Sequence, residues 1–76
     1  MSARLPVVTA RDVIRVAERL GFVFRRQRGS HAIYRRDRDR ARLVVPIHAG
    51  ETIRPGTLLS MLKDMGITRQ QFLEWL

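Results

Sequence analysis

The chain has no cysteine, and this absence excludes disulfide bridges and metal sites built on thiolates. It has no apolar run approaching the roughly 20 residues that a membrane-spanning helix needs. The apolar part of the N-terminal stretch, MSARLPVVTARD, is too short for a secretory signal. Together these absences predict a soluble protein of the reducing cytoplasm.

Histidines are also scarce, and the sequence lacks the common catalytic motifs. The two histidines, His31 and His48, stand seventeen positions apart, and with Glu51 they match no metal-ligand spacing. No glycine-rich phosphate loop, Ser-His-Asp set or pair of neighbouring carboxylates is visible. We therefore expect neither a metal ion nor a cofactor.

Acidic residues are few beside the basic ones. Fifteen basic and seven acidic residues give a net charge of +8, and every basic residue except Lys63 is an arginine. Between Arg25 and Arg42 the chain holds eight arginines and only two aspartates. The alternative is a solvated hairpin, but such one-sided charge favours a polyanionic partner, either nucleic acid or an acidic protein.

The length of 76 residues predicts one domain covering residues 1–76. A core of this size leaves no room for an enclosed deep pocket. Any chemistry should therefore take place on an open surface or in a shallow groove.

Periodicity and punctuation predict three helices. Thr9 can cap a helix over about residues 10–20 by accepting from the amide of Asp12, and Gly21 can end it. A second helix is predicted to begin at Pro55 and to end at Gly66. Thr68 and Gln71 form a capping-box pattern that predicts a short terminal helix.

Three segments between the first two helices are predicted to be strands, namely FVFRRQ (22–27), HAIYRR (31–36) and RLVVPI (42–47). Their short connections predict an antiparallel meander. The fold class is therefore α+β, an α-β-β-β-α two-layer sandwich with a short C-terminal helix. The same order of elements is found in double-stranded RNA-binding domains.

His31 begins the second of these strands, directly after a Gly29-Ser30 turn signal. Alternation places His31, Ile33 and Arg35 on one side and Ala32, Tyr34 and Arg36 on the other, without settling which set faces the helices. Imidazole exchanges protons near neutral pH. RNA supplies its own nucleophile, the 2′-hydroxyl, so one histidine and several arginines suffice for cleavage without a metal. The alternative is a surface histidine at a turn.

Other residues also leave two interpretations open. Gly29 and Ser30 can serve only the turn, which is favoured, or they can let a phosphate approach the backbone. His48 can approach the start of the second strand, or it can be a loop histidine that packs against the second helix. Tyr34, Phe22 and Phe24 can stack on bases or lie in the core.

Several segments together resemble the HicA toxins of toxin–antitoxin pairs, a family also described as YcfA-like. They are LGF (20–22), RQRGSHAIY (26–34), VVPIH (44–48), PGTLLSMLKDMGI (55–67) and FLEWL (72–76). The resemblance extends from Leu5 to Leu76 and is specific in the order and spacing of these segments.

The resemblance implies a type II toxin that cleaves messenger RNA and so blocks translation. In the family the histidine of a Gly-Ser-His motif is catalytic, and the matching position here is His31. It also implies a HicB-like antitoxin that covers His31, and it implies that only the antitoxin of the pair binds DNA. We expect RNA contacts from Arg26, Arg28, Gly29, Ser30 and Arg35. The alternatives are a non-catalytic RNA-binding module and an inactive homologue kept for its antitoxin complex.

Overall fold

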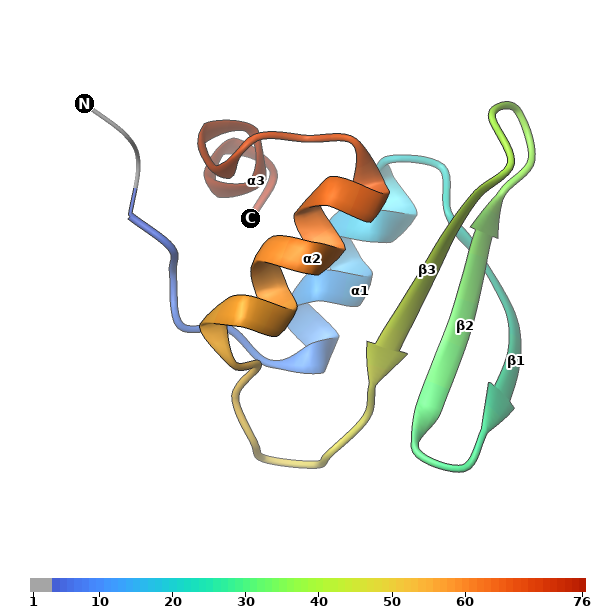
Figure 1. Ribbon diagram of the computed structural model, residues 1–76, viewed down its shortest axis with the longest axis horizontal. Coiled ribbons are helices and arrows are strands. Elements are labelled where there is room, and N and C mark those ends of the chain that lie inside the picture. Colours follow the sequence, from blue (N-terminus) through green and yellow to red (C-terminus); the bar gives the residue numbers. More distant parts are fainter. Residues whose placement is uncertain (1–3) are drawn as a thin grey trace.

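The computed structural model describes residues 4–76 and has the expected order of elements. These are α1 (Ala10–Arg19), β1 (Val23–Arg28), β2 (His31–Arg36), β3 (Ala41–Pro46), α2 (Pro55–Met65) and α3 (Arg69–Trp75). All three helices lie on one side of the sheet, with α3 on the far side of α1 and α2, and the other face of the sheet is bare (Figure 1). The predicted α-β-β-β-α layout is confirmed.

The three strands form one antiparallel sheet in the order β1-β2-β3, as a meander requires. His31 at the start of β2 lies opposite Arg28 of β1 and Pro46 of β3. The β1–β2 pairing shifts register between Phe24 and Arg26, so that Arg25 is the extra residue of a bulge. Because β2 is paired on both sides, the register determines which residues of β1 and β3 lie beside each of its residues.

The core lies between the helices and the helix-facing side of the sheet. The apolar stripe of α1 contributes Val13 and Val16, each with no exposed surface, and α2 contributes Leu58. Phe72 of α3 is also fully buried, so the short last helix closes the far side of this core. Burying a side chain of this size stabilises the fold by about 1.5–3 kcal/mol.

The helix ends follow the signals in the sequence. The Thr9 amide donates to the Asp12 carboxylate at 2.9 Å, and the Asp12 amide donates back to the Thr9 hydroxyl at 3.4 Å. That first hydrogen bond lowers the pKa of Asp12. Thr68 and Gln71 form the same reciprocal box. Gly66 ends α2 at a φ of 74°, which a side chain disfavours.

Arg36, the last residue of β2, ties the sheet to the ends of two helices. Its guanidinium donates to the carbonyl of Leu20 at 3.0 Å and to that of Met65 at 3.2 Å, at the C-terminal ends of α1 and α2. It pairs with the Asp39 carboxylate at 2.8 Å and lies over the Phe22 ring at 4.5 Å. Arg36 therefore satisfies carbonyls that a helix end leaves without partners.

The hydrogen bonds that the Arg36 guanidinium donates to the Asp39 carboxylate lower the pKa of Asp39 to about 2. The turn between β2 and β3 is thus attached to the helical layer through one guanidinium.

No helix within residues 4–76 is long and apolar enough to cross a membrane.

Candidate nucleic-acid interface

The structure settles which side of β2 faces the helices. Ala32, Tyr34 and Arg36 are buried beneath the helical layer, whereas His31 and Arg35 are exposed on the bare side of the sheet. The histidine therefore lies on the only face of β2 that a large ligand can reach. Arg36 belongs to the basic 25–42 segment in sequence but not to its surface.

Strand pairing places the bare-face residues in three rows across the sheet. Arg28, His31 and Pro46 form the first row, and Arg26, Ile33 and Val44 form the second. In the third row, Arg35 of β2 lies between Val23 of β1 and Arg42 of β3. We call this surface the arginine face and define it as Arg25, Arg26, Arg28, His31, Ile33, Arg35, Arg42 and Val44.

The bulge in β1 adds one cation to this face. In a regular strand Arg25 and Arg26 would point to opposite sides of the sheet. Instead both side chains line one shallow depression together with Ile33, Arg35 and Arg42. The irregular residue is therefore an arginine turned toward its neighbours, which is a common use of bulges near functional sites.

Ile33 lies at the centre of the arginine face and is only 6% exposed, although no helix covers it. It lines both the depression beside Arg25 and Arg26 and a second hollow formed with Arg28, His31 and Arg42. Arginine stems can cover apolar surface while their charged ends stay in water. Ile33 therefore gives the surrounding arginines an apolar base and limits their freedom.

Most cations of the arginine face have no counter-charge within the protein. In the described part of the chain, the side chains of Arg26, Arg28, Arg35 and Arg42 take part in no hydrogen bond or ion pair. Arg25 differs, because its guanidinium lies 3.0 Å from the Asp37 carboxylate at the end of β2. Four unpaired guanidinium groups thus share one sheet face with one histidine and concentrate positive charge there.

Gly29 and Ser30 form the two-residue turn before His31. Gly29 has a φ of 60°, and its carbonyl accepts from the Gln27 side chain at 3.0 Å. The Ser30 carbonyl accepts from the Ile47 amide at 2.6 Å. Both residues thus have the turn role that the sequence favoured, and their contact with phosphate stays a prediction. Their place in the turn sets His31 at one end of the face.

Other residues that the sequence singled out lie elsewhere. Exposed His48 lines hollows beside the first turns of α1 and α2 and follows Ile47, whose amide donates to Ser30, so both interpretations of its role stay predictions. Tyr34 and Phe22 are buried, and Phe24 meets the Tyr34 ring edge-on at 5.6 Å. Base stacking on Tyr34 and Phe22 was therefore a wrong alternative, whereas Phe24 is 49% exposed and stacking on its ring stays a prediction.

One residue of the face, Arg42, was not named among the expected contacts. It lines both hollows of the arginine face, including the one that contains His31. The signal was present in the sequence, since alternation along 42–47 places Arg42 and Val44 on one side. What was missing was the β2–β3 register that sets Arg42 opposite Arg35.

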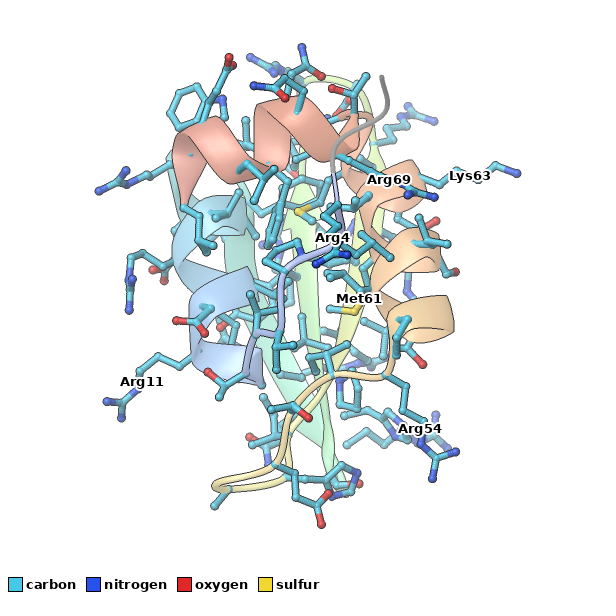
Figure 2. All side chains as sticks on the ribbon, turned by 90° about the vertical axis from the view of Figure 1, so that its left-hand side faces the viewer. Arg4, Arg11, Arg54, Met61, Lys63 and Arg69 are labelled. Carbon is cyan, nitrogen blue, oxygen red and sulfur yellow. The ribbon has the colours of Figure 1, made fainter. Side chains whose placement is uncertain are left out.

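The helical side of the molecule does not gather charge in the same way. Arg11, Arg54 and Lys63 project from three separate places on the rim of the helical layer, whereas Met61 points into the interior (Figure 2). Among residues 4–76 no three histidine or carboxylate side chains lie close enough to hold one metal ion. The densest positive surface is therefore the arginine face.

Part of the chain matches a known family. Residues 10–67 fit the model of a family described as the HicA toxin of bacterial toxin–antitoxin systems. The matched segment runs from the first residue of α1 to just beyond α2 and contains the whole arginine face. A comparison with curated proteins found no match.

Proposed function

The chain belongs to the HicA toxin family, and we propose that it is a metal-independent endoribonuclease that blocks translation by cleaving messenger RNA. One observation carries the proposal. His31 shares a bare sheet face with four arginines, Arg26, Arg28, Arg35 and Arg42, that have no counter-charge in the described chain. That arrangement suits general-base chemistry on a phosphodiester.

In the proposed reaction the neutral His31 imidazole takes the proton of a 2′-hydroxyl. The 2′-oxygen bonds to the adjacent phosphorus, and the bond from phosphorus to the 5′-oxygen breaks. The leaving oxygen takes up a proton from the imidazolium or from water. The products are a 2′,3′-cyclic phosphate and a 5′-hydroxyl, and DNA is not cleaved because it lacks the nucleophile.

The arginines have the second role in this reaction. Arg28 and Arg42 line the same hollow as His31, so their guanidinium groups can stabilise charge that grows on the phosphate oxygens. Arg26 and Arg35 lie one and two rows away and bind neighbouring phosphates. Gly29 and Ser30 let the strand approach the backbone at the turn. No step needs a metal ion or a cofactor.

Membership in the family implies a HicB-type antitoxin as the partner. We propose that this antitoxin is acidic and covers His31 together with part of the arginine face. Such docking neutralises the unpaired cations, speeds association and blocks the site in one step. DNA is then contacted only through the antitoxin.

The test uses a short DNA strand that contains one ribonucleotide, incubated with the protein in the presence of EDTA. Wild type should cleave only at the ribonucleotide and leave a cyclic phosphate. His31→Ala should reduce the rate by about 100-fold or more, since general-base catalysis contributes at least that much. His48→Ala is the matched control and should cleave like wild type.

Other outcomes of this experiment would contradict the proposed function or support one of its alternatives. Equal cleavage by His31→Ala and wild type contradicts the catalytic role. RNA binding without cleavage by wild type indicates a non-catalytic RNA-binding module. Antitoxin binding without RNA binding indicates an inactive homologue. Growth and messenger RNA integrity after induced expression of both variants test the same proposal in cells.

A further inference from the structure

We infer that the RNA strand lies along β2, so that the arginine face holds the phosphates on one side of the cleaved bond only. This inference rests on the proposed ribonuclease function and assigns it a substrate path. The cleaved bond lies at His31, and the strand leaves the protein on its other side over the Gly29–Ser30 turn.

The spacing of the rows supports a path along the strand. Alternate residues of a β-strand are separated by about 6.6–6.8 Å. This distance is comparable with the separation of successive phosphates in an extended nucleic acid strand. The rows at His31, Ile33 and Arg35 each bring at least one unpaired arginine from β1, β2 or β3. Three rows therefore match the cleaved phosphate and its next two neighbours.

An acidic residue lies at the far end of this path along β2, beyond the row of Arg35 and Arg42; we call the three rows the phosphate track. Asp37 follows β2 directly, and its carboxylate lies 3.0 and 3.2 Å from the guanidinium of Arg25. The exposed turn 37–40 contains two aspartates and two arginines, so it offers a fourth phosphate no excess of positive charge. The track therefore ends at the row of Arg35 and Arg42.

The other end of the track, beyond His31, has no comparable set of cations. The β1–β2 connection there is Gly29 and Ser30, and Pro46 takes the β3 place in the row of His31. The hollow past Pro46 contains Arg54, but it also contains Glu51, so it presents no excess of positive charge. Arg54 projects from the rim of the helical layer (Figure 2). A path across the sheet toward Arg54 is therefore the weaker alternative.

The strand on this face is held by its backbone and not by its bases. The apolar residues in the three rows are Val23, Ile33, Val44 and Pro46, and none of them is aromatic. Base stacking on aromatic rings is the usual second element of single-strand binding. Its absence from the rows predicts that the identity of the bases on the bound side has little effect.

The experiment uses the DNA strand with one ribonucleotide and replaces one phosphate at a time by a neutral methylphosphonate. Replacing either of the first two linkages on one side of the ribonucleotide should lower kcat/KM about tenfold, as expected for losing a charged hydrogen bond. Replacements on the opposite side should change kcat/KM less than about twofold. The sensitive side gives the polarity of the bound strand.

Two variants test which row of arginines contacts which phosphate. The variant Arg35→Gln, which leaves the hollow around His31 intact, should lose most of its sensitivity to the farther of the two sensitive phosphates and stay sensitive to the nearer one. The matched control Arg54→Gln should keep both sensitivities. Equal losses on both sides of the ribonucleotide, or loss of sensitivity in Arg54→Gln, would overturn the path along β2.

A second readout separates this inference from the proposed function. The same phosphate replacements are made in an uncleavable all-DNA strand, and its Kd is measured by fluorescence anisotropy. If no substrate is cleaved, the ribonuclease proposal fails. In that case the path along β2 is supported if the two sensitive linkages adjoin each other and the farther one depends on Arg35, and it is refuted otherwise.

Discussion

Arg35 and Arg36 are neighbours in the sequence with opposite surroundings, and we predict that replacing them has opposite consequences. Arg36→Ala removes two hydrogen bonds from a charged group to the carbonyls of Leu20 and Met65. Each such bond contributes about 1.5–3 kcal/mol, so the loss should reach about 3–6 kcal/mol. Arg35 is exposed and has no partner in the described chain, so Arg35→Ala should stay within about 0.5 kcal/mol of wild type.

The predicted loss is large beside the stability of so small a protein. Stabilities of about 0.05–0.15 kcal/mol per residue give about 4–11 kcal/mol for 76 residues. A small domain loses about 4–8 °C of Tm for each kcal/mol, so Arg36→Ala should melt at least about 12 °C below wild type. Thermal and urea unfolding followed by circular dichroism measure both quantities.

A third variant separates the hydrogen bonds of Arg36 from its packing. Arg36→Met keeps an unbranched stem near Phe22 but cannot donate to the two helix ends, so it should recover only a small part of the loss. If Arg36→Ala melts within a few degrees of wild type, or Arg35→Ala melts as low as Arg36→Ala, the assignment of Arg36 to the fold is wrong. At temperatures where both variants are folded, Arg35→Ala should bind RNA more weakly than Arg36→Ala.

Three further predictions concern pH, salt and the antitoxin. The pKa of Asp39 is lowered from 3.8 to about 2, so the ion pair of Asp39 with Arg36 stabilises the fold fully above about pH 4. This stabilisation is lost as the pH falls toward about 2. Wild-type Tm should therefore fall more steeply than that of Asp39→Asn between about pH 4 and pH 2, and parallel curves would refute this. RNA affinity should fall steeply with salt, and removing the charge of Arg28 or Arg35 should reduce the logarithmic slope by about 0.7, the value for one single-strand phosphate contact; an unchanged slope would place that residue off the strand. The antitoxin should protect β2 from hydrogen exchange, compete with RNA and raise Tm; protection limited to α3 would exclude direct occlusion of His31.

The helices and strands could be predicted closely because each has a local signal. The capping box at Thr9, Pro55 at the start of α2 and Gly66 at its end act within one turn of chain. The three strands were placed to within a residue for the same reason, since their connections are short and polar.

The candidate site could be predicted only in part, because its geometry depends on pairing between strands. The alternation of β2 grouped His31 with Arg35, but it did not say which side the helices cover. The bulge that turns Arg25 onto the face and the register that sets Arg42 opposite Arg35 are both non-local. Arg36 shows the same limit, since its acceptors Leu20 and Met65 are 16 and 29 positions away in the sequence.

The two different faces of β2 also restrict where the protein can tolerate the insertion or deletion of a residue. A single residue inserted between His31 and Arg36 would turn the residues on one side of the insertion to the opposite face of the sheet. His31 and Arg35 would then no longer share one face, whichever side of the insertion keeps its place. The arrangement of the arginine face would be lost in one mutational step. Length variation in this hairpin should therefore be confined to its turns, at 29–30 and 37–40.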